Sequence, residues 1–501
     1  MTTQKFPKQF YLVAVLLFLV LSSCKQGSVS PNQEDNPYED LISTMYQRGQ
    51  FNGNVMVIKK GQIVYQGSFG IKNIDPLDSL ELGDRFRLAS VSKQFTAAAI
   101  VQLNEQGKLA YDQDVRDFIP ELPYKGITVR HLLNHVSGLP DYVALLDEYW
   151  KPELAYNDLD KFVSGNDDII NMLIEKKPKI DFEPEVKWAY SNTGYLLLAS
   201  IVAKASGMPF ETYVKQNIFG PAGMGSVVYD YKPDSDPNMP ERVFGYRTEL
   251  DGSRVLEDRQ YLNPVQGDGG IYASLEDLRK WDRALYTDKI MSKASKKEAF
   301  SPFVLKNGDT TDYGFGWFLD KSPTGKKVVS HGGGWVGFRT FIYREIEEDN
   351  CFIILTNNSD SNLGAAIDEL KKILHDEPYE IPKIAISDTL ARVILNKDLA
   401  SGIDLYESLK KTDPNNYDFS EGQLNRLGYQ LMAIEKNTEA IGVLEYNNKL
   451  FSSSANTFDS MGDAYLAAGD TITALVNYKI AVQMDSTMTY SVDKINKLSM
   501  P

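Results

Sequence analysis

The stretch from Phe86 to Ile100 constrains what this chain can fold into more than any other. It begins as a turn and continues with apolar residues at helical spacing, namely Val91, Phe95, Ala98, Ala99 and Leu103. Ser90 is therefore expected at or near the start of a helix, with Lys93 one turn further along the same face. Free N–H groups and the positive end of the helix dipole would lie where an oxyanion forms. At this spacing, a lysine that is desolvated enough to lose its charge can be part of the base that activates the serine.

Ser-x-x-Lys alone is weak support for catalysis, because at a single match the serine usually caps a helix and the lysine is solvated. The same spacing also starts at Ser22, Ser408 and Ser491. Ser90 needs further motifs to distinguish it from these three.

Two further motifs follow in the chain. Tyr190-Ser191-Asn192 comes 100 residues after Ser90. His331-Gly332-Gly333-Gly334 comes directly after a strand-like run at 328–330. Glycines at this place would let a substrate lie backbone to backbone along the strand edge.

Residues 1–23 are expected to be a secretory leader. Lys5 and Lys8 precede an apolar run at 10–21 that is too short for a comfortable membrane span. The run ends in Leu-Ser-Ser-Cys24, which resembles the bacterial lipobox, whose cysteine is lipidated. The resemblance implies a lipid anchor on Cys24 in the cell envelope, in the outer membrane because Lys25 follows. An ordinary signal peptide or a membrane anchor is the alternative.

The net charge and the cysteine count argue against several kinds of partner and site. A net charge of −15 argues against nucleic acid and against basic docking to a membrane. Besides Cys24 the chain has one cysteine, Cys351, in an apolar strand-like run that predicts a buried core position. Two cysteines allow no disulfide framework or cysteine-based metal site. His131 and His135 lack the glutamate of a zinc-protease motif and are expected to pack in the structure.

Strand signals at both ends of residues 38–375 enclose a helical middle. They lie at 54–58 and 62–67, joined as a hairpin, and again at 327–330, 338–344 and 351–356. Helical and irregular segments dominate from Ser90 to about residue 285. The pattern predicts one α+β domain whose terminal strands share a sheet, with the active centre between the sheet and the helices. Residues 24–37 read as a polar tether to this domain.

The C-terminal region carries an internal repeat. Residues 376–389, with Pro378 and Pro382, are expected to be a linker. In residues 390–501 similar side chains recur with a 34-residue period, as at Gly428 and Gly462 or Ala440 and Ala474. The period resembles tetratricopeptide repeats and implies an all-α domain that could bind a protein partner, with flanking helices at about 389–411 and 487–498. An unrelated helical bundle is the alternative.

Taken together, Ser90-x-x-Lys93, Tyr190-x-Asn192 and His331-x-Gly333 resemble the serine β-lactamase-like family, which includes penicillin-binding DD-peptidases, D-aminopeptidases and related esterases. Stretches at 132–140, 267–271 and 313–317 also match it. The resemblance implies an antiparallel sheet flanked by helices, with a helical subdomain, over roughly residues 38–375.

The resemblance also implies roles for the motif residues. Ser90 would attack a carbonyl and become acylated, and Lys93 and Tyr190 would share the proton transfer. Asn192 would donate to the substrate amide and to Lys93. The N–H groups of Ser90 and Gly334 would form the oxyanion hole beside Gly333. His331 would bind substrate at the place where β-lactamases carry lysine. We expect neither a metal nor a cofactor.

Two departures from the family pattern affect the expected activity. Glu185 follows Pro184 where the family often has glycine, and His331-Gly332-Gly333 replaces Lys-Thr-Gly. We therefore expect an envelope serine hydrolase that acts on a small ester or amide, including D-amino-acid peptides of peptidoglycan type. A β-lactamase or DD-peptidase is the first alternative. A non-catalytic adaptor lipoprotein is the second.

Overall fold

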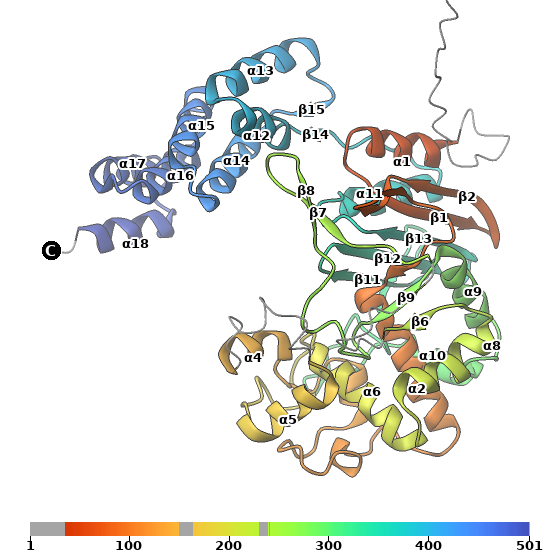
Figure 1. The fold of residues 1–501 in the computed structure, drawn as a ribbon. Helices are drawn as coiled ribbons and strands as arrows, with labels where there is room; N and C mark the ends of the chain where they lie inside the picture. Colours follow the sequence, from red (N-terminus) through yellow and green to blue (C-terminus); the bar gives the residue numbers. More distant parts are fainter. Residues whose placement is uncertain (1–35, 150–163, 230–238, 240, 500–501) are drawn as a thin grey trace, which may run out of the picture.

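A six-stranded antiparallel sheet organises the N-terminal part of the molecule (Figure 1). The computed structural model describes residues 36–149, 164–229, 239 and 241–499. The sheet order is β10-β11-β12-β13-β1-β2. Its strands are β1 (Gly53–Lys59), β2 (Gln62–Phe69), β10 (Phe318–Lys321), β11 (Lys327–Trp335), β12 (Phe338–Glu345) and β13 (Asn350–Thr356). β1 pairs with β13 from Gly53 opposite Thr356 to Ile58 opposite Cys351, which confirms that strands from both ends share one sheet.

The two faces of this sheet pack against different helices. On one face, Val55 and Val57 of β1 pack with α1 (Pro37–Gln47) and α11 (Leu363–Leu374). On the other face, Met56 and Ile58 pack into a larger core shared with the helical region. Successive residues of a strand face opposite ways, so one strand supplies both cores.

The helical region predicted between the terminal strands covers the second face of the sheet. Its helices and short helical turns are η1 (Ala89–Ser92), α2 (Lys93–Glu105), η2 (Val115–Asp117), α3 (Val129–Leu133), α4 (Tyr142–Tyr149), α5 (Asn166–Lys176), α6 (Asn192–Ser206), α7 (Phe210–Val214), η4 (Lys215–Phe219), α8 (Gly220–Ala222), α9 (Leu275–Leu285) and α10 (Lys293–Ala299). α2 packs on α6, and α2 is buried over most of its length. Trp281 of α9 donates to Gln94 of α2 at 2.8 Å, which fixes the helix that follows Ser90.

Short strands complete this part of the chain. They are β3 (Ile71–Ile74), β4 (Leu77–Ser79), β5 (Phe86–Arg87), β6 (Val227–Val228), β7 (Tyr246–Thr248), β8 (Arg254–Leu256) and β9 (Ile271–Ala273). β5, β9 and β6 form a small sheet in that order. β5 ends just before η1, so this sheet anchors the turn that carries Ser90.

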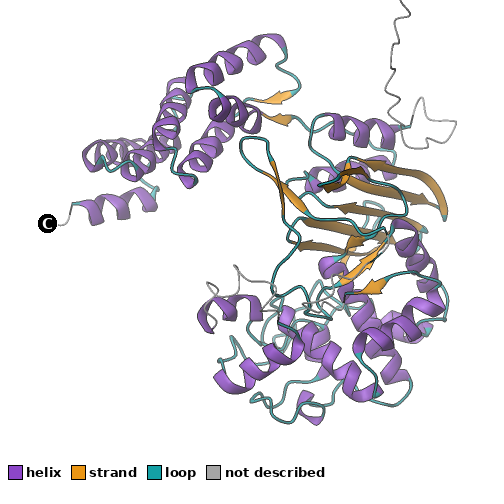
Figure 2. Cartoon of the chain, in the orientation of Figure 1, coloured by secondary structure: helices purple, strands orange, loops and turns teal. Residues whose placement is uncertain are grey.

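The C-terminal region is helical, as Figure 2 shows. After β14 (Ile384–Ala385) come α12 (Ile386–Asn396), α13 (Leu399–Thr412), β15 (Tyr417–Asp418), α14 (Glu421–Ala433), α15 (Asn437–Leu450), α16 (Ala455–Ala467), α17 (Thr471–Met484) and α18 (Thr489–Leu498). α12 begins inside the segment expected to be a linker, and the helix expected at about 389–411 is divided between α12 and α13. β14 pairs with β15, a non-local contact that the linker prediction did not contain.

The pair α16 and α17 repeats the pair α14 and α15, and both ends of each helix are offset by the period of the sequence repeat. Gly428 lies against Leu444, and Gly462 lies against Tyr478 at the equivalent position. A Cβ atom at either glycine would stand 2.5 Å from the facing side chain, so both glycines allow the paired helices to approach closely.

The C-terminal helices contact the N-terminal part directly. Arg48 donates to the carbonyl oxygen of Pro382 at 2.8 Å and to Asn416 at 2.5 Å. Asn396 of α12 donates to the carbonyl oxygen of Asp251, between β7 and β8, at 3.1 Å. Leu250 packs against the core of the first repeat helices. The two parts are therefore joined by contacts on both sides of α12.

Some predicted features fall outside the described residues. The leader, Cys24 and nearly all of the tether lie in residues 1–35. Within the described ranges, no helix is both long enough and apolar enough to span a bilayer. Cys351 is fully buried and unpaired in the sheet core, as predicted.

Candidate active site

Ser90 lies on η1, the short turn between β5 and α2. Ala89, the residue before it, has φ +48°, a left-handed backbone conformation that residues other than glycine rarely adopt. The hydroxyl of Thr340 on β12 donates to the carbonyl oxygen of Leu88 at 2.7 Å and ties the turn to the central sheet. The structure thus places Ser90 just before a helix, as predicted, on a turn that its neighbours hold in a strained form.

Lys93 is the first residue of α2, and its side chain is completely buried. Its Nζ donates to Ser90 Oγ at 3.0 Å, to Asn192 Oδ1 at 2.8 Å and to the carbonyl oxygen of Asp268 at 2.9 Å. All three ammonium protons therefore have acceptors. Loss of one of these protons would turn the Lys93–Ser90 hydrogen bond into a path for removing the serine proton.

The direction of the Lys93–Asn192 hydrogen bond corrects one expectation. Asn192 was expected to donate to Lys93, but its side-chain oxygen accepts from the ammonium because a protonated lysine has only donors. The amide nitrogen of Asn192 has no hydrogen bond to any described residue. Asn192 also lines the cavity beside Ser90, where this nitrogen can meet a substrate carbonyl.

Tyr190 lies beside the same ammonium group. Lys93 Nζ is 4.9 Å from the centre of the Tyr190 ring, and the His135 ring packs against Tyr190 with centroids 4.3 Å apart. The backbone N–H of Ser191 donates to His135 Nδ1 at 3.2 Å. Burial, with the charge of Lys93, holds the pKa of His135 well below its usual value. A neutral His135 therefore supports the segment that carries Tyr190. His131 lies apart from this contact, with its Nε2 3.0 Å from a carboxylate oxygen of Glu185.

His331 occupies a different position from the one expected of a substrate-binding residue. Its side chain is 1% exposed, with Nε2 2.9 Å from the hydroxyl of Tyr313 and Nδ1 2.6 Å from the carbonyl oxygen of Gly332. Since a carbonyl oxygen only accepts, Nδ1 carries the proton and Nε2 accepts from Tyr313. Burial and the charge of Lys93 lower the pKa of His331 to about 3. His331 is thus neutral, and both of its ring nitrogens are already bonded within the protein.

The glycines after His331 bring β11 against η1. A Cβ atom on Gly333 would stand 2.2 Å from the carbonyl oxygen of Leu88 and 3.1 Å from the backbone nitrogen of Ser90. β10 pairs with β11 only as far as Ser330, so the edge of β11 beyond it is not paired by that strand. Gly334 on this edge lines the cavity beside Ser90. The strand and the turn therefore present backbone groups to the same small space.

This cavity has a volume of about 60 Å³. Its lining residues are Arg87, Ala89, Ser90, Tyr142, Val143, Asn192, Leu262, Val265, Asp268, Gly269, Gly334 and Trp335. Sequence reasoning missed Arg87, Tyr142, Asp268 and Trp335 as site residues. Two of them gave a signal: Arg87 is a charged residue in an otherwise apolar approach to Ser90, and Asp268 lies in the stretch at 267–271 that matches the family.

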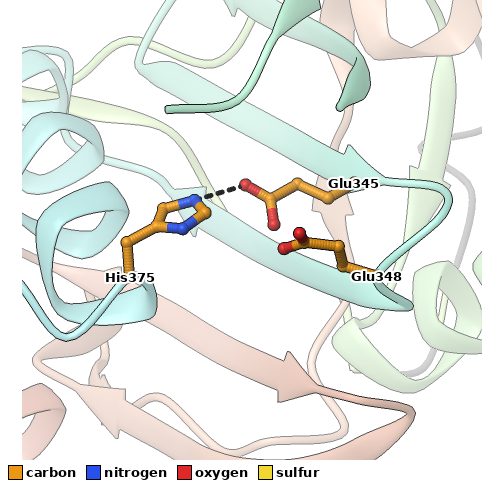
Figure 3. A group of neighbouring side chains, drawn as sticks. All are labelled: Glu345, Glu348 and His375. Atoms are coloured by element: carbon orange, nitrogen blue, oxygen red, sulfur yellow. Dashed lines mark hydrogen bonds and ion pairs between the residues drawn. The ribbon is translucent and has the colours of Figure 1, made fainter. Parts of the chain in front are cut away.

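A second group of titratable side chains, Glu345, Glu348 and His375, lies at the end of β12 that is remote from Gly334 (Figure 3). The carboxylate of buried Glu345 accepts from Tyr343 at 2.9 Å, from His375 at 2.6 Å and from Asn350 at 2.8 Å. Both of its oxygens thus have donors inside the protein. The group joins the end of α11 to the sheet, and nothing in its geometry calls for a metal ion.

Comparison with known proteins gives consistent matches. The family described as Beta-lactamase matches residues 39–377. Penicillin-binding protein 4* of Bacillus subtilis (strain 168) is 40% identical over 355 residues, 69% of this chain and 77% of that protein. A D-aminopeptidase of Gluconobacter oxydans (strain 621H) is 26% identical over 331 residues, 66% of this chain and 59% of that protein.

Solved structures show the same similarity. A penicillin-binding protein from Bacillus halodurans has a TM-score of 0.56 and 26% identity, covering 67% of this chain and 99% of that one. The D-amino acid amidase of Ochrobactrum anthropi SV3 has a TM-score of 0.56 and 20% identity, covering 68% and 98%. The second likeness concerns the fold alone.

Proposed function

This chain belongs to the beta-lactamase family of serine hydrolases, and from that premise we propose that Ser90 is its nucleophile. The proposed reaction is hydrolysis of a small ester or amide through an acyl-enzyme on Ser90. The observation that carries the proposal is the 3.0 Å hydrogen bond between Ser90 Oγ and the Nζ of a completely buried lysine.

In the acylation step, Ser90 Oγ forms a bond to the substrate carbonyl carbon and loses its proton to the Lys93–Tyr190 pair. The N–H groups of Ser90 and Gly334 would stabilise the negative oxygen. The leaving group takes a proton as its bond to carbon breaks. Water then attacks the acyl-enzyme, and Ser90 recovers its proton as the acid is released.

The surroundings of His331 favour esters and amides over β-lactams. In a β-lactamase, a lysine at this place can meet the substrate carboxylate with a permanent charge. Here the ring is neutral and buried, and both of its nitrogens are bonded within the protein, so it gives a substrate carboxylate no charged hydrogen bond. Such a bond contributes about 1.5–3 kcal/mol, or roughly tenfold to a hundredfold. We propose D-amino-acid peptides or amides among the substrates, in line with the names of the D-aminopeptidase relatives.

Penicillin binding is the second candidate. It is favoured by the 40% identity to penicillin-binding protein 4*, over most of that protein's length. A penicillin that acylates Ser90 and is released only slowly would be consistent with the similarity to penicillin-binding protein 4* and with the lack of charge on His331.

The test is covalent labelling followed by intact-mass spectrometry. A fluorophosphonate should label the wild type and Ser191→Ala but not Ser90→Ala; Ser191 is a matched buried control that follows Tyr190. Fluorescent penicillin separates the two candidates: efficient labelling supports penicillin binding, and labelling by the fluorophosphonate alone supports an esterase or amidase. No labelling by either reagent would favour a non-catalytic adaptor, and an adduct in Ser90→Ala would refute the nucleophile.

The C-terminal helices are proposed to be tetratricopeptide-like repeats that bind a protein partner. The equal offset of both helices between the pair α14–α15 and the pair α16–α17 supports this, as do Gly428 and Gly462 at equivalent contacts. Pull-down from envelope extracts with the wild type and with a variant altered on exposed positions of α16 would test the proposal. Equal recovery of every protein with both baits would contradict it.

We also propose that the protein is a lipoprotein anchored through Cys24 in the bacterial cell envelope. The multiple acyl chains of a bacterial lipoprotein bind a membrane firmly, whereas one chain binds only marginally. Cys24→Ser should release the protein from membranes or leave its leader uncleaved. Membrane retention of cleaved Cys24→Ser protein would rule out this anchor.

A further inference from the structure

Arg87 lies on β5, three residues before Ser90, and lines the same cavity. Its side chain is buried, with 2% of the residue exposed. Its Nη2 donates to the carbonyl oxygen of Asn263 at 3.0 Å. Its Nε and Nη1 are buried and have no hydrogen-bond partner in the described structure. Arg87 therefore lines the cavity while two of its three guanidinium nitrogens stay unpaired within the described protein.

Three aromatic rings surround this guanidinium group. Its carbon atom is 5.6 Å from the ring centre of Tyr229 and 5.9 Å from those of Tyr272 and Trp335. Tyr272 also faces Arg87 across the β5–β9 pair. Ring faces attract a cation and hold it in place, but they do not replace the hydrogen bonds that its N–H groups make in water.

The cavity does not supply a counter-ion for Arg87 among its described residues. Arg242, next to the same Tyr229 and Tyr272 rings, pairs with Asp258 at 2.5 Å, whereas no described carboxylate lies at ion-pair distance from Arg87. Among the described lining residues the one carboxyl group, that of Asp268, accepts from Tyr142 at 2.8 Å. Burial raises the pKa of Asp268, and the charge of Lys93 opposes this rise. Arg87 is thus a buried cation whose charge this cavity leaves uncompensated.

An uncompensated buried charge is costly to a folded protein unless a ligand pairs with it. We propose that Arg87 binds a negatively charged group of the substrate, a carboxylate, in the cavity beside Ser90. The inference rests on the proposed function, because the bound group and the scissile carbonyl must belong to one molecule. It places recognition of negative charge at Arg87, away from the neutral His331.

Catalysis tests the proposal with matched pairs of 4-nitrophenyl esters. Succinyl, glutaryl and adipoyl monoesters are compared with butyryl, pentanoyl and hexanoyl esters of equal chain length, after subtraction of the non-enzymatic rate. The wild type should prefer at least one carboxylated ester, and Arg87→Gln should lower that preference about tenfold to hundredfold. Arg87→Lys should retain part of it. Arg85→Gln is the matched control and should leave the preference unchanged, because Arg85 pairs with Glu241 instead.

A binding measurement separates this inference from the proposed function. Full-length Ser90→Ala is titrated by calorimetry with adipamic acid, which has one amide and one carboxylate end, and with adipamide, which has two amide ends. Tighter binding of adipamic acid supports Arg87 as the anion site, even if the labelling experiment fails to identify Ser90 as the nucleophile. Equal binding of the two compounds, or an ester preference unchanged in Arg87→Gln, would overturn the inference.

Discussion

At the scale of single residues, the ammonium group of Lys93 organises the site. It bonds Ser90 and Asn192, lies beside Tyr190, and contributes to the low pKa of His331. The resemblance of the three motifs, taken together, to the serine β-lactamase-like family predicted this gathering. The motifs did not predict that His331 is buried with both ring nitrogens bonded within the protein, since this depends on Tyr313 and on the fold of β11.

Tyr190→Phe removes one of the two groups proposed to move the Ser90 proton. We expect kcat to fall by about 10²–10⁴, with little change in stability because the ring still packs on His135. Steady-state kinetics on a 4-nitrophenyl ester measures the effect, and thermal unfolding checks the fold. An unchanged kcat would remove Tyr190 from the proton transfer.

His331 should make the protein sensitive to acid. The folded state binds a proton at His331 only near pH 3, whereas the unfolded chain does so near 6.5. The unfolded state therefore gains protons first as the pH falls, so this stabilisation is complete above pH 6.5 and is lost progressively towards pH 3. Between pH 7 and pH 5 the loss is about 2 kcal/mol.

Urea unfolding of wild type and His331→Gln at both pH values measures this dependence. His331→Gln is expected to lose less stability than the wild type over the same interval, while the contribution of His135 remains in both proteins. Parallel pH profiles for the two proteins would show that His331 does not carry the effect.

At the scale of elements, the contact between β11 and η1 sets the geometry of the site. The sequence predicted five of the six strands of the central sheet, and it predicted a helix after Ser90 from its periodicity. It missed β10 (Phe318–Lys321), the edge strand that pairs with β11. It did not predict that α12 begins at Ile386, because β14 is fixed by pairing with β15, which follows only after α12 and α13. Local patterns indicate elements, whereas pairings between distant segments decide where they begin.

Gly333→Ala tests the β11–η1 contact. The new methyl group would stand 2.2 Å from the carbonyl oxygen of Leu88, which is backbone and cannot turn away. We expect the strand to shift from Ser90 and kcat/KM to fall by at least about a hundredfold, since a small misplacement of catalytic groups costs that much.

Gly332→Ala is the matched control for this substitution. Its methyl group would meet the Phe341 side chain at 3.5 Å, an ordinary contact on the opposite face of β11. Its kcat/KM should stay near that of the wild type. Similar losses in the two variants would show that the glycine segment needs general flexibility rather than this one close approach.

At the scale of the whole molecule, the C-terminal helices lie beside the catalytic part without supplying a residue to the cavity. The sequence indicated this division by its change to a repeating pattern. It could not indicate the contacts of Arg48 with Pro382 and Asn416, because these join positions that the whole catalytic part separates along the chain.

A chain that ends at Lys383 should hydrolyse a small ester at close to the full-length rate. It keeps Tyr379 and Ile381, which pack against the core formed with α1 and α11. A chain that ends at Asp376 loses both side chains and should unfold at a lower temperature with a similar specific activity. If the longer truncated protein is folded but inactive, the C-terminal helices support the active site.

The position of β1 between β2 and β13 also determines how late in synthesis the central sheet can be completed. β1 is an interior strand, and its partner on one side, β13, is the last strand of the sheet to leave the ribosome. The nascent chain must therefore keep one edge of the apolar strand β1 unpaired until nearly the whole catalytic part has been made. Late closure of this kind slows folding and exposes aggregation-prone edges. Chaperones that hold unfolded chains should thus matter more for the yield of this protein than for that of its C-terminal helices, whose contacts are mostly between neighbours.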